Sequence, residues 1–342
     1  MKRTLVLFVA MFNILLPQSI KSPINSKYTE LPGDNYSILI AGHLYGAPQN
    51  VNSVFPSSSL LGCLEEINNL DCAFFISAGD VFRSSDERIV LNYMKSFSNR
   101  LNFPIFNAVG NHDVGNRKLY TKYFGETYYD FIYGSELYVF LDSELDNSKI
   151  IGKQLEYFST VLLEKALRTN VKNVIVVSHK LIWAANIPKY KNIYNHLNSN
   201  FGYETYDQFN SIIIPILKDI GKQKNVYWIS GDIGCSWSLP LFYDKDPDTG
   251  ISFIATGLGD TEKDLILKLD VMDSEISMSL LHLSDDSGGN IESFNLEFWE
   301  EYFDNTHILN KIRKILFHKY YLLGIVSVFP VLALLLFRRK KS

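Results

Sequence analysis

Short apolar runs alternate with longer amphipathic stretches along most of the 342-residue chain. The short runs are rich in β-branched and aromatic residues, which predicts strands that are buried on both faces. These strands are expected at 36–41, 73–78, 105–109, 137–141, 173–177 and 226–230. The stretches between them have helical spacing and length, at 58–70, 85–98, 153–167 and 206–221. Such alternation predicts an α/β sheet.

The pattern changes after residue 250. Residues 251–255, 265–271 and 276–283 have the composition of strands, and 272–275 between the last two suits a hairpin turn. A polar loop follows at 284–290, and amphipathic helices are expected at 294–303 and 308–318, leading to the C-terminal end.

The N-terminal end carries a targeting signal. Met1, Lys2 and Arg3 precede an apolar run at 5–16, which is short for a bilayer span and typical of a signal-peptide core. No small-x-small cleavage site follows it. Residues 1–19 are therefore predicted as a signal peptide or an uncleaved N-terminal anchor.

The C-terminal end predicts a membrane anchor. Residues 320–337 hold no charged side chain, and four cations follow at 338–341. This length and this basic stop predict a transmembrane helix at 320–337 and a basic cytoplasmic tail at 338–342. Because the N-terminal signal exports the middle of the chain, we expect a single-pass membrane protein with its main domain on the extracytoplasmic side.

The remaining chain divides into three parts. Residues 20–35 are polar and are predicted as a linker, 36–283 as the main domain, and 284–319 as a juxtamembrane segment with an amphipathic helix. The basic part of that last segment suits either an anionic membrane surface or an ordinary stop before the membrane helix.

Composition excludes several classes of protein. Hydrophobic residues make up 46% of the chain and charged residues 20%, which excludes general disorder. The net charge is −4 without a basic stripe, so there is no nucleic-acid signature. Three cysteines, Cys63, Cys72 and Cys235, allow one internal bridge at most, which excludes a disulfide scaffold.

Polar residues follow the predicted strands at the point where each strand ends. Ligands of open α/β sheets bind at the carboxyl ends of the strands, so these side chains are expected to converge. Their nitrogen and oxygen donors suit a divalent cation of the Mn, Fe, Zn or Mg class. The residues are His43, Asp80, Asn111, His112, Asp113, His179 and Asp232.

These residues make the chain resemble the calcineurin-like metallophosphoesterase family over 36–283. The family pattern runs Asp-x-His, Gly-Asp, Gly-Asn-His-Asp, a strand-ending His, and Gly-His-x-His. Its middle three elements match at Gly79-Asp80, at 110–113 (Gly-Asn-His-Asp) and at His179. The resemblance implies an α/β fold in which two mixed β-sheets form a sandwich flanked by helices.

The first and last elements depart from the family pattern. Ala41 stands where the family has Asp, although His43 is kept, and Asp232 and Gly234 stand in place of the two final histidines. The resemblance then implies one complete metal position, formed by Asp80, Asn111, His179 and Asp232. The other position would need Ala41, His43, Asp80 and Gly234, and two of these four cannot ligate.

The resemblance also implies roles for two residues that are not metal ligands. His112 would be the proton donor to the leaving group, and Asp113 would orient it. Other interpretations stay open: Asp80 and Asn111 could be turn formers or helix caps, His43 a hydrogen-bonded loop histidine, and Asp232 a turn residue. Cys235 could donate a thiolate in place of the missing histidine.

We therefore expect an exported, membrane-tethered and metal-dependent phosphoester hydrolase with one well-formed metal site. Its expected partners are a phosphoester substrate and the membrane, through the C-terminal helix. The alternative is a catalytically inactive binding module of the same fold at the cell surface. A third possibility is a two-metal enzyme in which Cys235 or a backbone group fills the gap.

Overall fold

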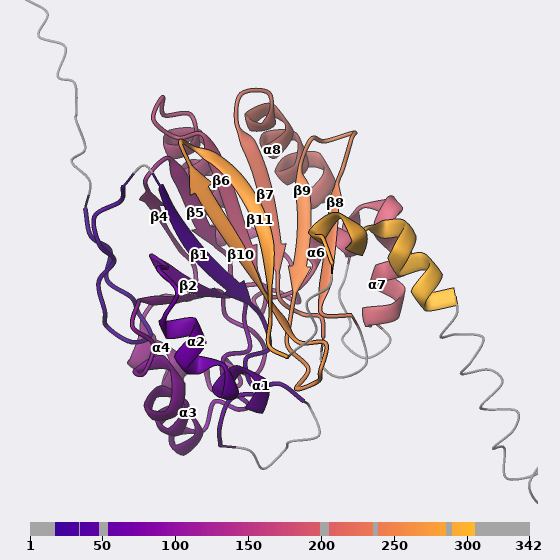
Figure 1. The fold of residues 1–342 in the computed structure, drawn as a ribbon. Coiled ribbons are helices and arrows are strands. Elements are labelled where there is room, and N and C mark those ends of the chain that lie inside the picture. Colours follow the sequence, from indigo (N-terminus) through magenta and orange to yellow (C-terminus); the bar gives the residue numbers. More distant parts are fainter. Residues whose placement is uncertain are drawn as a thin grey trace, which may run out of the picture.

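The computed structural model describes residues 18–33, 35–47, 54–198, 205–234, 239–284 and 289–304. Two β-sheets lie face to face with helices on their outer sides (Figure 1). The first sheet has the strand order β11-β10-β1-β2-β3 and the second the order β4-β5-β6-β7-β9-β8. Both sheets combine parallel and antiparallel pairs, so the sandwich of mixed sheets implied by the resemblance is confirmed.

The first sheet contains the predicted N-terminal strands. Its parallel core is β1 (Asn35–Ala41), β2 (Phe74–Ser77) and β3 (Ile105–Asn107). The predicted hairpin, β10 (Leu265–Met272) and β11 (Glu275–His282), adds to this core through an antiparallel pairing of β10 with β1.

The second sheet has a parallel centre and antiparallel edges. The parallel strands are β5 (Glu136–Phe140), β6 (Asn173–Ser178), β7 (Asn225–Ser230) and β9 (Ser252–Thr256). The edge strands β4 (Tyr129–Tyr133) and β8 (Leu241–Lys245) were not predicted from the sequence. Both carry polar residues within the run, and three residues of each strand are only partly buried or exposed, which interrupts the continuous apolar signal.

Helices cover the outer face of each sheet. The first sheet packs against α1 (Ser58–Gly62), α2 (Leu64–Asn68), α3 (Glu87–Tyr93), its π-helical continuation η1 (Met94–Ser98), and α4 (Arg117–Phe124). The second sheet packs against α5 (Gly152–Val161), η2 (Leu162–Ala166), α6 (Ile182–Asn186), η3 (Pro188–Tyr190), α7 (Lys191–Asn198), η4 (Phe209–Ile213) and α8 (Ile214–Gly221).

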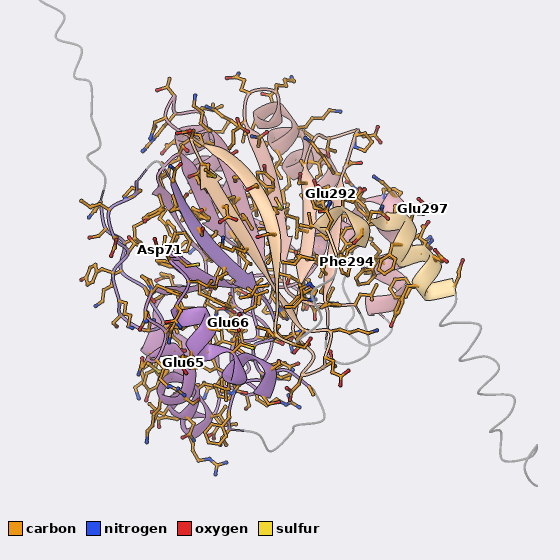
Figure 2. The ribbon with its side chains drawn as sticks, in the orientation of Figure 1. Glu65, Glu66, Asp71, Glu292, Phe294 and Glu297 are labelled. Atoms are coloured by element: carbon orange, nitrogen blue, oxygen red, sulfur yellow. The ribbon has the colours of Figure 1, made fainter. Side chains whose placement is uncertain are left out.

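The predicted helix at 58–70 shows why these segments are helical. It is divided into α1 and α2 at Cys63, and in α2 the apolar Leu64 and Ile67 are buried against the sheet. Glu65 and Glu66 of the same helix are exposed to solvent on the outside of the molecule (Figure 2). This spacing buries one stripe of the helix and leaves the other hydrated.

Two segments expected to lie outside the domain are part of it. In the predicted linker, Ile24 is buried and the Ser22 hydroxyl donates to the Ile105 carbonyl at 2.6 Å. Beyond residue 283, η5 (Ile291–Phe294) leads into a helix from 296, where Trp299 is fully buried and donates to the Leu241 carbonyl at 2.8 Å. Both flanking segments therefore supply core side chains beyond the boundaries expected at 36 and 283.

The terminal predictions fall mostly outside the described residues. Residues 1–17, the transmembrane helix expected at 320–337 and the tail at 338–342 all lie there. Within the part of the chain that the structure describes, no helix has both the length and the apolar character needed to span a bilayer. Cys63 and Cys72 are free thiols, and Cys235 is outside the described residues.

Candidate metal centre

Five loops meet where the carboxyl ends of parallel strands from both sheets come together. The loops after β1, β2 and β3 carry His43, Asp80 and His112, and those after β6 and β7 carry His179 and Asp232. All five lie near one another, although the first and last are far apart along the chain. The predicted convergence of strand-end polar residues is therefore observed in the structure.

Two histidines and two carboxylates form a compact group. His43 Nε2 lies 3.5 Å from Asp80 Oδ2 and 3.4 Å from Asp232 Oδ1. His179 Nε2 lies 3.4 Å and 3.8 Å from the same two oxygens. All four side chains are nearly excluded from solvent. We refer to His43, Asp80, His179 and Asp232 as the four-residue cluster.

Both histidines are held so that Nε2 faces the cluster. His43 Nδ1 hydrogen-bonds the Ile233 carbonyl at 2.8 Å, and His179 Nδ1 hydrogen-bonds the Ala78 carbonyl at 3.0 Å. A carbonyl accepts only, so Nδ1 carries the proton and Nε2 of the neutral ring presents its lone pair. Second contacts of this kind fix the ring orientation of metal-binding histidines.

The cluster is supported by backbone conformations with little room for change. His43 and Asp80 both have positive φ, at 48° and 56°. The preceding glycine in each loop is closely surrounded: a Cβ at Gly42 would overlap the Gly231 carbonyl oxygen, and a Cβ at Gly79 would overlap the His179 ring. Such strained positions occur where the surrounding structure enforces them, often at functional sites.

Asp113 supports the Asp80 loop instead of orienting His112. Its Oδ2 accepts from the backbone N–H groups of Asp80 at 2.9 Å and Gly110 at 3.0 Å, and its Oδ1 accepts from Phe82 N–H at 3.0 Å. The role expected for Asp113 is thus corrected. A short carboxylate that directly follows a tight turn reaches backbone donors more readily than the neighbouring ring.

His112 is oriented by the loop after β2. Its Nδ1 donates to the Arg83 carbonyl at 2.7 Å, and its backbone N–H donates to Asp80 Oδ1 at 2.9 Å. Its Nε2 lies 4.0 Å from Asp80 Oδ2, and 27% of its side chain is exposed. His112 therefore lies at the solvent side of the cluster, where an incoming substrate can contact it.

Tyr45 and Arg83 flank His112, and Tyr45 was not singled out in the sequence prediction. The Tyr45 ring packs on His112, with centroids 4.8 Å apart, and on His43 at 5.5 Å. The Arg83 guanidinium lies 5.2 Å from the centroid of the Tyr45 ring. The position of Tyr45, two residues after His43 in the same loop, was the available sequence signal.

The electrostatics of the cluster favour a cation. Burial alone would raise the pKa of Asp80, but His179, His112 and His43 outweigh it and hold the pKa below its usual range. Burial lowers the pKa of His179, yet the charges of Asp80 and Asp232 raise it to about 9. Two buried carboxylates thus attract positive charge into the space that they share with the histidines.

The donor set fits a divalent metal ion. The four separations between histidine nitrogens and carboxylate oxygens are 3.4–3.8 Å, less than twice the roughly 2.0–2.2 Å at which such atoms bind a metal ion, so donor pairs can share one ion. Those separations are long for good hydrogen bonds. His179 Nε2 is buried and has no hydrogen-bond partner. A buried ring nitrogen left in this way lacks a partner, and a bound ion would supply one.

The structure places two of the expected ligands differently from the resemblance. His43 was assigned to the incomplete metal position, but it groups with His179 and Asp232, whose ligand atoms lie within 4.8 Å of one another. The Asn111 side chain is exposed, although its neighbours Gly110 and His112 contact Asp80. Asp80, His179 and Asp232 are brought together as expected, while Asn111 lies outside the buried group.

The second metal position lacks two ligand side chains, because Ala41 and Gly234 stand there. At Gly234 there is also no space for a side chain. Ala41 is buried among apolar residues of the outer core of the first sheet. Gly234 has φ +90°, and a Cβ there would overlap the Gly257 carbonyl oxygen. A histidine therefore does not fit at position 234, because the local backbone accommodates only glycine.

Comparison with known proteins identifies the family. A sequence model of the calcineurin-like phosphoesterase family matches residues 36–212, and no curated protein sequence matches significantly. Among solved structures, the chain is similar to GAP50, the anchor in the inner membrane complex of Plasmodium, at 14% identity and a TM-score of 0.49, over 74% of this chain and 86% of that one. It is also similar to purple acid phosphatase PPD1 from yellow lupin (Lupinus luteus) seeds, at 12% identity and a TM-score of 0.49, over 78% of this chain and 56% of that one. Because the family match covers more than half of the 342 residues, the chain belongs to the calcineurin-like phosphoesterase family.

Proposed function

We propose that this protein hydrolyses phosphoesters with a single divalent metal ion held by the four-residue cluster. The observation that carries the proposal is the spacing of its donors, in which two histidine nitrogens each lie 3.4–3.8 Å from two carboxylate oxygens. The family acts on phosphoesters and uses divalent metals, which agrees with this donor set. An ion held there would supply Lewis-acid activation of a phosphoryl oxygen and of water.

His112 is assigned the proton transfer. Its Nε2 lies at the exposed side of the cluster, and its Nδ1 is fixed by the Arg83 carbonyl. A protonated ring in this position can donate from Nε2 to the leaving oxygen of an ester bound against the cluster. Asp80 Oδ1 accepts the backbone N–H of His112, which keeps the His112 loop beside the cluster. The other oxygen, Oδ2, faces the cluster histidines.

Membrane attachment on the extracytoplasmic side is proposed from the sequence. The apolar residues at 5–16 and 320–337 and the basic residues at 338–341 support it. Attachment would keep the cluster close to substrates on the same membrane. Alkaline extraction of membranes, followed by protease protection of the intact chain, tests this placement: release by carbonate, or cleavage only from the cytosolic side, contradicts it.

Metal content and turnover test the hydrolase proposal. The full-length chain is expected to retain about one equivalent of metal and to cleave p-nitrophenyl phosphate or its bis ester. His179→Ala should lose both, whereas His282→Ala, a histidine outside the cluster, should keep both.

The inactive binding module is favoured if the wild-type chain binds no metal and has no turnover. Loss of activity would have a structural reason, because Ala41 and Gly234 cannot supply ligands to the second metal position. Two equivalents of metal would instead indicate a contribution from Cys235 or from a backbone group.

A further inference from the structure

A buried ion pair lies next to the four-residue cluster, at the carboxyl ends of β5 and β6. Lys180 directly follows the cluster residue His179, and its Nζ lies 2.8 Å from Glu144 Oε2 and 2.8 Å from Ser148 Oγ. Only 13% of the Lys180 side chain and 8% of the Glu144 side chain are exposed. The ordinary expectation for a lysine at a sheet edge, a hydrated side chain, does not hold here.

The loop after β5 is fixed to the loop that carries His179. The backbone N–H of Lys180 donates to Ser143 Oγ at 3.0 Å, and Glu144 N–H donates to Asp142 Oδ1 at 2.9 Å. The backbone N–H groups of Gly231 and Asp232 both donate to the His179 carbonyl at 2.9 Å. The backbone of Lys180 is therefore held in a fixed position relative to the cluster.

The chain itself places this ion pair beside the cluster, because Lys180 is bonded to His179 and its backbone N–H is held by Ser143 Oγ. Burial raises the pKa of Glu144, and the positive Lys180 and His179 oppose that rise while Asp80 adds to it. Charges on His179 and Asp80 thus act on Glu144 directly. A phosphate oxygen bound beside the cluster would be attracted by the positive charge of Lys180.

A family site with two divalent ions presents four positive charges to the substrate, and a site with one ion presents two. Ala41 and Gly234 remove ligands of the second position in this chain. A phosphomonoester dianion then meets less positive charge unless side chains compensate. Lys180 has the required charge, and its ammonium on a flexible stem can exchange one hydrogen-bond partner for another.

We propose that Lys180 binds an anionic oxygen of the phosphoester and supplies positive charge that the incomplete second metal position cannot. One of its contacts to Glu144 or Ser148 is exchanged for the substrate oxygen when the ester binds. This assignment rests on the proposed hydrolase function and adds a substrate-contacting residue to it.

The test uses the full-length chain loaded with Mn²⁺ and compares Lys180→Met, Lys180→Arg and Glu144→Gln. The matched control is Lys165→Met, which breaks a similar ion pair, with Asp130 at 2.6 Å, outside the cluster. The readouts are Mn²⁺ stoichiometry, the Kd of inorganic phosphate by calorimetry, and KM and kcat for p-nitrophenyl phosphate.

Lys180→Met is expected to weaken phosphate binding about ten- to hundredfold, the range for losing a hydrogen bond to a charged group, and to raise KM in parallel. Mn²⁺ stoichiometry should stay the same. Lys180→Arg should restore most of the phosphate affinity. Glu144→Gln removes the competing carboxylate, so phosphate should bind at least as tightly as to the wild type.

A purely structural ion pair predicts a different pattern, in which Lys180→Met and Glu144→Gln weaken phosphate binding equally. That pattern, or wild-type phosphate affinity in Lys180→Met, overturns the proposal. If Lys180→Met does not fold, Glu144→Gln decides alone, and a tenfold weaker phosphate affinity in it refutes the role. A wild-type chain that binds neither Mn²⁺ nor phosphate refutes the proposed function, whereas one that binds both while Lys180→Met is unaffected refutes only this inference.

Discussion

The carboxylate of Asp113 accepts the backbone N–H of Asp80 at 2.9 Å, which makes Asp113 a support for the loop that carries a cluster carboxylate. Two further backbone N–H groups, of Gly110 and Phe82, share the same carboxylate. Burial and the nearby charge of Asp80 raise the pKa of Asp113 to about 7, while the Gly110 and Phe82 N–H groups oppose the rise. The two acidic residues are therefore linked both mechanically and electrostatically.

Asp113→Asn should destabilise the protein and weaken metal binding together. An amide cannot accept all three N–H groups, and a buried donor without a partner costs about 1–3 kcal/mol. Denaturant unfolding and metal titration measure the two effects. Asp248→Asn, at an exposed aspartate, is the control and should change stability by less than about 0.5 kcal/mol. Lost turnover with unchanged stability and metal affinity would restore the role first expected for Asp113, that of orienting His112.

His112→Ala should reduce kcat without releasing metal. The ring is the general acid in the proposed mechanism, and removal of such a group typically lowers kcat by about 10²–10⁴. Its backbone N–H, which holds Asp80, is unaffected by the substitution. Steady-state kinetics and elemental analysis of the same preparation separate the two effects. Loss of the metal along with activity would show that His112 is a ligand.

Metal affinity should increase with pH from about 6.5 to 9. The charges of Asp80 and Asp232 overcome the opposing effect of burial and raise the pKa of His179 to about 9, so the metal-free protein holds a proton on this ring at neutral pH. A metal ion requires the neutral ring, so binding displaces this proton and becomes easier as pH approaches 9. Titrations in buffers with different ionisation enthalpies would measure the released proton. Constant affinity over this range would exclude His179 as a ligand.

Gly234→His should lower the stability of the protein and should not restore a second metal position. The Cβ overlaps the Gly257 carbonyl oxygen and φ is +90°, so strain and overlap together should cost about 2–5 kcal/mol. Gly250→His is the matched control, because Gly250 also has positive φ, at +76°, but has open space around its Cβ position. Thermal unfolding of both variants isolates the overlap. A second equivalent of metal in Ala41→Asp with Gly234→His, at wild-type stability, would contradict this account.

Trp299→Ala should destabilise the whole domain by about 3–5 kcal/mol, the range for removing a buried large aromatic side chain. Trp299 is fully buried beside β8, while its neighbour Phe298 is 39% exposed. Phe298→Ala is therefore the control, with an expected change below about 0.5 kcal/mol. Equal small effects in both variants would mean that the domain ends near residue 283, as the sequence first indicated.

The apolar runs of the sequence predicted six strands correctly because strands enclosed on both faces leave a continuous apolar signal. Strands β4 and β8 escaped prediction because polar and partly exposed residues interrupt their apolar runs. Segments 20–35 and 284–304 are polar overall, so isolated core residues such as Ile24 and Trp299 did not reveal that they pack on the domain.

The sequence by itself determined the family and the place of the chemistry, because a His or Asp directly after a buried strand must lie at the shared edge of the sheets. Only the tertiary structure decided which of these side chains meet. His43 joins His179 and Asp232, Asn111 stays exposed, and Asp113 turns to the backbone. The physical reason is that side-chain direction in a tight loop depends on which distant backbone groups accept or exclude it. The spacing of residues along the chain does not predict contacts between distant backbone groups, such as the close approach of Gly234 to Gly257.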